Sequence, residues 1–191
     1  MAAQAAITGL SPQEIAYDLL MHDGTGNGML YIALGNLHQG KLDEVHALMQ
    51  RDDIVLGLGD GGAHYSAICD ASYTTFVLTH WLRDRDSDRL GLGHAVHHLA
   101  ARPAQAVGLL DRGLLHPGYK ADVNVIDWER LMLHKPVIRR DLPGGGRRLD
   151  QSATGYVATI CSGEVIRRDD QPTGARPGKL VRGSKVAPAP E

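Results

Sequence analysis

A chain of 191 residues can form one domain, or one domain and part of another. Its 20 lysines and arginines against 22 aspartates and glutamates give a formal charge of −2, which provides no broad basic surface for nucleic acid. The sequence contains neither an apolar run of the ~20 residues that span a bilayer nor a signal-peptide pattern, and Cys69 and Cys161 match no metal or disulfide motif. We therefore expect a cytoplasmic protein with no nucleic-acid and no membrane partner.

The first elements along the chain alternate between helix and strand patterns. SPQE, with an N-cap serine, a proline at the first helical position and a capping-box glutamate, predicts a helix over 11–21. MLYIAL at 29–34 and IVLGLG at 54–59 are apolar runs typical of buried strands, and a helical pattern at 41–50 lies between them. This order predicts a parallel strand–helix–strand unit with a functional loop just after Gly59.

Helical patterns continue to about residue 110 and then give way to β-type runs. Apolar residues at helical spacing predict a helix over 73–85, and HAVHHLAAR at 94–102 predicts another, which Pro103 should end. Short β-favouring runs separated by turn residues follow at 113–127, 153–161 and 163–169. The second half of the chain is therefore expected to be rich in strands.

The strongest candidate site is GLGDGGAH at 57–64, where Asp60 follows a buried-type strand. A carboxylate at the C-terminal end of a parallel strand can bind a metal, take a proton from a metal-bound water and return it to a leaving group. His64 could hydrogen-bond a substrate carboxylate or position Asp60, and Gly61 and Gly62 would let a substrate approach the backbone. The structural alternatives stay open, because Asp-Gly is a common turn dipeptide and a single loop histidine is often merely solvated.

A histidine cluster is the second candidate. His94, His97 and His98 have helical i, i+3 and i+4 spacing, so two of them can share a face and grip a metal. No carboxylate accompanies them in an HExxH pattern, so we interpret them as a polar helix face with incidental affinity for transition metals. A histidine-based metal-binding protein is the weaker alternative.

Several motifs, in order, resemble one enzyme superfamily. GLGDGGAHYSAICDASYTTFVLTHWLRDR at 57–85 resembles the amidohydrolases, in particular the D-aminoacylase or N-acyl-D-amino-acid deacylase branch. DRGLLHPGYKADVNVID at 111–127 and TGYVATICSGEVIRRDDQPTGARPGKLVRG at 154–183 are similar to the small β-domain of these proteins. SPQEIAYDLL at 11–20 fits the helix before the last two barrel strands. The resemblance thus covers nearly the whole chain.

The resemblance implies an α/β fold: the C-terminal part of a (β/α)₈ TIM-type barrel of a metal-dependent hydrolase, followed by part of a small β-sandwich domain. Residues 1–110 would form the last strands and helices of the barrel, residues 111–183 the β-domain segment, and residues 184–191 a disordered tail. Because two strands cannot close a barrel, the implied partner is either the missing N-terminal portion of the barrel or a homo-oligomer partner.

The resemblance also implies a reaction. In such enzymes a zinc-bound water attacks an amide carbon, and the aspartate after the last barrel strand moves the proton. By motif position Asp60 takes that role, as catalytic residue and metal ligand, with His64, Gly61 and Gly62 as substrate-binding residues. Relatives often have Ser where this chain has Gly59.

The implied ligand set is incomplete. Zinc needs about four ligands, and the His-x-His motif and the middle-strand ligands of the family do not occur in this sequence. We therefore expect a C-terminal fragment of a hydrolase that cleaves a carbon–nitrogen bond other than a peptide bond, in an N-acyl-D-amino acid or a related amide, and that is inactive alone. The alternative is a non-catalytic remnant or interaction module.

Overall fold

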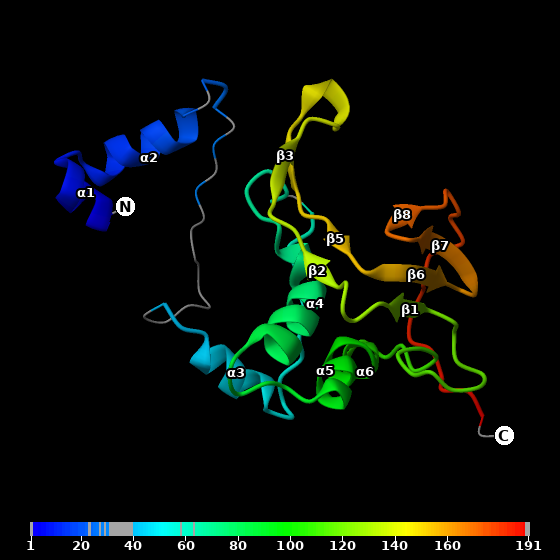
Figure 1. The fold of residues 1–191 in the computed structure, drawn as a ribbon. Coiled ribbons are helices and arrows are strands. Elements are labelled where there is room, and N and C mark those ends of the chain that lie inside the picture. Colours follow the sequence, from blue (N-terminus) through cyan, green and yellow to red (C-terminus); the bar gives the residue numbers. More distant parts are fainter. Residues whose placement is uncertain are drawn as a thin grey trace. The chain divides into compact units, whose positions relative to one another are not determined.

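The computed structural model divides the chain into two compact units, Met1–Arg51 and Asp52–Glu191, which we describe separately (Figure 1). The structure describes residues 2–22, 24–26, 28, 30, 40–57, 59–62 and 64–189. This division lies earlier in the chain than the domain boundary expected after residue 110, and that expected boundary stays a prediction about the family's domains. None of the described helices is long and apolar enough to cross a membrane.

The first unit contains the helices α1 (Ala2–Thr8), α2 (Pro12–Met21) and α3 (Asp43–Met49). The predicted capping box of α2 is confirmed. The Ser11 hydroxyl accepts a hydrogen bond from the Glu14 amide at 3.2 Å, and the Glu14 carboxylate accepts one from the Ser11 amide at 2.8 Å. The Ser11 amide, together with the Ser11 hydroxyl, which also donates to the Glu14 carboxylate at 2.8 Å, holds the pKa of Glu14 below its usual value. The helix predicted over 41–50 forms as α3.

The predicted parallel strands are not part of the described structure. The run at 29–34 lies outside the described residues, apart from Leu30. Residues 54–57 and Gly59 form no strand, and Val55 is 44% exposed, so the strand predicted over 54–59 is wrong. An extended segment becomes a strand only beside a hydrogen-bonding neighbour, and every strand pair among the described residues is antiparallel and lies elsewhere.

The predicted helix over 73–85 is confirmed, but it changes type along its length. It follows a short 3₁₀ turn, η1 (Asp70–Ser72), and consists of one α-turn, α4 (Tyr73–Phe76), and the π-helix η2 (Val77–Asp84). At its end the Arg85 amide donates to the His80 carbonyl at 3.2 Å, which is the five-residue spacing of a π-helix.

The sequence predicts that Pro103 ends the next helix, and this prediction is wrong. The break lies at Ala100, with φ −127° and ψ −76°, between α5 (Leu92–Leu99) and α6 (Ala101–Ala106). Pro103 therefore lies in the first turn of α6. A proline is tolerated there because its missing N–H would have no acceptor within the helix.

The second half is rich in antiparallel strands, as predicted (Figure 1). One sheet has the order β1-β6-β7-β8, and two further pairs are β2 with β5 and β3 with β4. Their bounds are β1 (Val123–Ile126), β2 (Met132–Leu133), β3 (Val137–Arg139), β4 (Arg148–Asp150), β5 (Ala153–Thr154), β6 (Tyr156–Cys161), β7 (Glu164–Arg168) and β8 (Gln171–Pro172), with a 3₁₀ turn η3 (Pro143–Gly145) between β3 and β4.

The core of the second unit joins the helical and strand-rich parts. Trp81 on η2 and Leu131 before β2 are 2% and 1% exposed. Between them, the Arg83 guanidinium donates to the carbonyls of Trp128 and Leu131, at 2.8 Å each. These two bonds satisfy carbonyls of the segment between β1 and β2, which belongs to no strand.

Backbone hydrogen bonds fix Lys185, near the end of the chain, to residues 108–110. Lys185, within the segment expected to be a disordered tail, pairs in parallel with Leu109. Its amide donates to the Gly108 carbonyl at 2.8 Å, and its carbonyl accepts from the Leu110 amide at 3.2 Å. Backbone pairing thus holds Lys185, and the disordered tail expected over 184–191 stays a prediction.

Candidate functional site

The structure brings two predicted site residues together. Asp60 Oδ2 and His64 Nδ1 lie 3.3 Å apart, and their side chains are 47% and 62% exposed. An exposed pair of this kind contributes about 0–1 kcal/mol to stability, so folding alone does not demand it. Asp60 has φ +46°, a left-handed conformation that is uncommon outside glycine and that aspartate tolerates better than most residues. The carboxylate is thus presented from a tight, solvent-facing turn.

The glycines around Asp60 differ in what surrounds them. A Cβ atom added at Gly59 would lie 2.5 Å from the Cα atom of Ala71, so this position accepts only glycine unless the backbone moves. This contact explains why the chain does not carry Ser here. At Gly61 an added Cβ would be 3.4 Å from the Ala71 side chain, and at Gly62 it would meet open space. Gly62 therefore leaves the backbone accessible beside Asp60.

Residues of β4, which are distant in sequence, contact Tyr65, directly after His64. The Tyr65 carbonyl accepts a hydrogen bond from the Leu149 amide of β4 at 2.7 Å, and the Arg148 guanidinium lies 6.0 Å from the centre of the Tyr65 ring. The amides of Ala67 and Ile68 both donate to the His64 carbonyl at 2.9 Å. No sequence pattern predicts the β4 contacts, since they join segments more than 80 residues apart.

The described residues do not fit a zinc ion. No group of three or more His, Cys, Asp or Glu side chains with ligand geometry occurs in the part of the chain that the structure describes. Asp60 has one neighbouring histidine, whereas a catalytic zinc site usually takes three ligands from protein. Zinc therefore remains an implication of the family resemblance.

The histidine cluster on α5 is not the polar face that the sequence predicted. His98 is only 2% exposed, and its Nδ1 atom has no hydrogen-bond partner among the described residues. Burial, together with the nearby His94 ring, lowers the pKa of His98. The rings of His94 and His98 lie with centroids 4.2 Å apart and planes 32° from parallel. No third His, Cys, Asp or Glu joins these rings in a metal-binding group within the described part of the chain.

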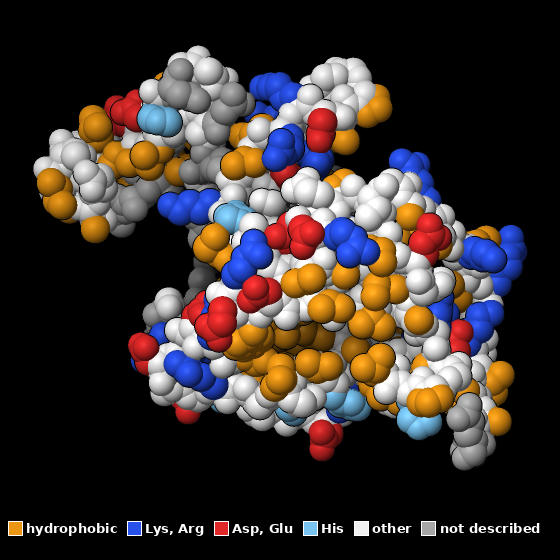
Figure 2. Space-filling view, turned by 45° about the vertical axis from the view of Figure 1, so that its right-hand side comes forward, with side chains coloured by type: hydrophobic (Ala, Val, Ile, Leu, Met, Phe, Trp, Pro, Cys, Tyr) orange, Lys and Arg blue, Asp and Glu red, His pale blue; other side chains and the backbone are white. Residues whose placement is uncertain are grey.

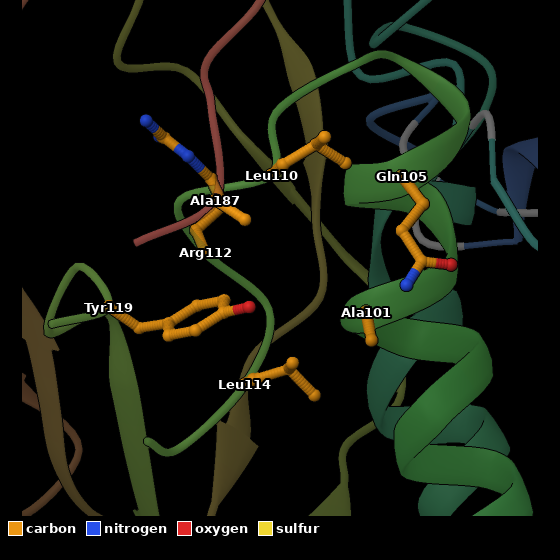
Figure 3. A pocket seen from close by; sticks show the side chains of 7 residues that line it. All are labelled: Ala101, Gln105, Leu110, Arg112, Leu114, Tyr119 and Ala187. Carbon is orange, nitrogen blue, oxygen red and sulfur yellow. The ribbon is translucent and has the colours of Figure 1, made fainter. Parts of the chain in front are cut away.

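Among the described residues, the second unit has one pocket beside α6 and another along η2, and neither of these is lined by Asp60 or His64. The smaller, of about 130 Å³, lies beside α6. Figure 3 shows the Tyr119 hydroxyl and the Gln105 amide directed toward the space between them, with Leu114 and Ala101 at its edge. Its volume approaches that of cavities that admit one benzene molecule, about 150 Å³, and does not suit an N-acyl amino acid. The larger pocket, of about 380 Å³, lies along η2.

The chain matches the family model described as "Amidohydrolase family" over residues 1–167. No curated protein and no solved structure matches it. The family match includes the Asp60 loop, the helices of the second unit and most of the strands. It confirms the predicted superfamily and does not distinguish the branches within it.

Proposed function

Because the chain belongs to the amidohydrolase family, we propose that it takes part in hydrolysing a carbon–nitrogen bond other than a peptide bond, in an N-acyl-D-amino acid or a related amide. The hydrolase character rests on the family match. The substrate class rests on the resemblance of 57–85, 111–127 and 154–183 to the deacylase branch. Its partner would be the ligand-bearing N-terminal portion of a barrel or a second copy of the chain.

The pairing of Asp60 with His64 is the observation that carries this proposal. A carboxylate at this position can accept a proton from the attacking water as the oxygen–carbon bond forms. It can then give that proton to the amine nitrogen as the carbon–nitrogen bond breaks. His64 Nδ1–H would donate to Asp60 and orient it, and when the ring is protonated its Nε2–H could donate to a substrate carboxylate. The open space at Gly62 would let the substrate backbone approach.

Complementation tests the proposal. The purified chain is mixed, in the presence of zinc, with the portion of an N-acyl-D-amino-acid deacylase that carries the His-x-His motif and lacks the segment resembling this chain. We expect hydrolysis of N-acetyl-D-leucine by the mixture and by neither component alone. Asp60→Asn, which keeps the shape and removes the base, should lower the rate by about 10²- to 10⁴-fold.

Asp86→Asn is the matched control, because Asp86 is an exposed aspartate outside the Asp60 loop, and its variant should keep the full rate. Equal rates for Asp60→Asn and the parent chain would contradict the proton-transfer role. If N-acetyl-L-leucine were hydrolysed as fast as the D form, this rate would contradict the proposed D configuration of the substrate.

A non-catalytic interaction module is the second candidate, and exposed apolar side chains favour it. Leu115 is 89% exposed, Ile7 79% and Leu180 76%. Figure 2 shows hydrophobic side chains gathered on the visible face rather than scattered singly. Apolar patches of this kind often mark protein contacts. If the folded components bind one another but never hydrolyse the amide, this second function replaces the first.

A further inference from the structure

The larger pocket of the second unit is a groove between the helix η2 and the segment that follows β2. We refer to it as the η2 groove. It is lined by Phe76, Thr79, His80, Arg83, Asp84, Met132, Leu133, His134, Lys135, Pro136 and Gln151. Its volume of about 380 Å³ lies within the range of small-molecule sites, about 300–1,000 Å³. Asp60 and His64 do not line it, so it is separate from the proposed reaction.

The walls of the η2 groove are fixed by hydrogen bonds. Gln151 Nε2 donates to the His134 carbonyl at 2.9 Å, and its Oε1 accepts from the Ser72 hydroxyl at 2.6 Å. On the helical wall, Thr79 donates to the Thr75 carbonyl at 3.0 Å. Arg83 is anchored by the two carbonyl contacts described above. A site whose lining is already held loses little entropy when a ligand binds.

The helical wall has an unusual backbone. η2 is a π-helix of eight residues, Val77–Asp84, and four groove-lining residues come from it. π-Helical turns are rare and occur frequently at functional sites, because the wider turn shifts side chains relative to an α-helix. Here Thr79, His80 and Arg83 are all placed along one wall.

The groove carries one uncompensated positive charge. The Arg83 guanidinium binds both carboxylate oxygens of Asp84, at 2.6 and 3.2 Å, so these two charges cancel. Burial, together with the cation of Arg85, lowers the pKa of His80, which disfavours a positive charge on its ring. No carboxylate of the described part of the chain lies within 4.0 Å of the Lys135 ammonium. Lys135 is thus available to an anion.

The rest of the groove lining offers aromatic ring faces on one wall and aliphatic side chains on the other. The Phe76 and His80 rings stack with centroids 4.8 Å apart and planes 13° from parallel. Met132, Leu133 and Pro136 add aliphatic surface on the other wall. A single cation beside such walls suits a monoanion with an apolar body better than it suits a phosphate, which carries more charge and no apolar surface.

We propose that the η2 groove binds a small organic carboxylate with a flat apolar body, whose carboxylate pairs with Lys135 and whose body lies against Phe76 and the residues that follow β2. This binding requires no metal and no residue of the Asp60 loop.

Benzoate is the probe, and benzamide is its uncharged counterpart of nearly equal shape. Each is titrated into the full chain at pH 7 and followed by nuclear magnetic resonance or calorimetry. We expect saturable benzoate binding and about fivefold weaker benzamide binding, since an exposed ion pair contributes up to about 1 kcal/mol. Lys135→Gln should weaken benzoate binding by about the same factor and remove the preference over benzamide, whereas Lys135→Arg should retain it.

Lys179→Gln is the matched control, because Lys179 is an exposed lysine that does not line the groove. Its variant should bind benzoate like the parent chain, and so should Asp60→Asn, which separates this site from the proposed catalytic loop. The proposal is overturned if the folded chain shows no saturation below about 50 mM benzoate. Equal affinity for benzoate and benzamide, or unchanged affinity of Lys135→Gln, would also overturn it.

Discussion

Substituting Gly59 by alanine should destabilise the second unit, although glycine-to-alanine changes often stabilise proteins. The added Cβ atom would lie 2.5 Å from the Cα atom and 2.9 Å from the amide nitrogen of Ala71, and 2.9 Å from the Asp70 carbonyl oxygen. All three are backbone atoms, so no side chain can rotate away. The short turn η1 (Asp70–Ser72) or the Asp60 loop would have to move.

The expected magnitude follows from two opposing effects. Inserting a methyl group into a packed site costs about 1–3 kcal/mol, whereas alanine restricts the unfolded chain and stabilises by about 0.4–1 kcal/mol. The free energy of unfolding should therefore fall by about 1–2 kcal/mol. Gly62→Ala is the matched control: it adds the same methyl group three residues later, where the Cβ atom meets open space, and should be neutral or slightly stabilising.

Urea unfolding followed by tryptophan fluorescence measures the effect. The only two tryptophans, Trp81 and Trp128, both lie in the second unit, so the signal reports on the unit that contains Gly59. With a slope of about 1–3 kcal/mol per molar urea, Gly59→Ala should lower the unfolding midpoint by roughly 1 M relative to Gly62→Ala. Equal midpoints for the two variants would refute the close contact with Ala71. Gly59→Ser should behave like Gly59→Ala.

Two further predictions concern the same unit. Arg83→Ala should lower the free energy of unfolding by about 2–4 kcal/mol in the urea assay, because it leaves the Trp128 and Leu131 carbonyls without donors, whereas exposed Arg176→Ala should change nothing. Because the pKa of His98 is lower in the folded than in the unfolded chain, stability should be full above about pH 6.5 and fall as the pH drops below it. Unfolding midpoints at pH 7.5 and 5.5 should differ less for His98→Leu, and an equal difference would contradict the burial of a neutral ring.

Sequence patterns predicted the elements whose signals are local. The capping box at the start of α2 is confirmed because Ser11 and Glu14 lie three residues apart and bond to each other without a distant partner. The strands β6 and β7 are confirmed because a turn at 162–163 joins two β-favouring runs. The proximity of Asp60 and His64 follows from their four-residue spacing within one turn.

The wrong predictions concern elements that depend on distant neighbours. The run at 54–59 has the composition of a buried strand, but none of the described strands lies beside it to accept its hydrogen bonds. The helix over 73–85 changes to a π-helix at Val77, which apolar residues at helical spacing do not predict. Helical spacing predicts a polar face that includes His98, but spacing alone does not tell which face another segment covers, and His98 is buried.

The sequence by itself therefore determined the helix start at Ser11, the change from helices to strands near residue 110, the family and the chemical identity of the Asp60 loop. Only the tertiary structure decided that Gly59 must stay glycine, that His98 is buried and that η2 and the segment after β2 enclose a groove. The physical reason is the distance along the sequence over which each interaction acts. Capping and helical periodicity act within about four residues. Close packing and cavities arise between segments that only the folded chain brings together.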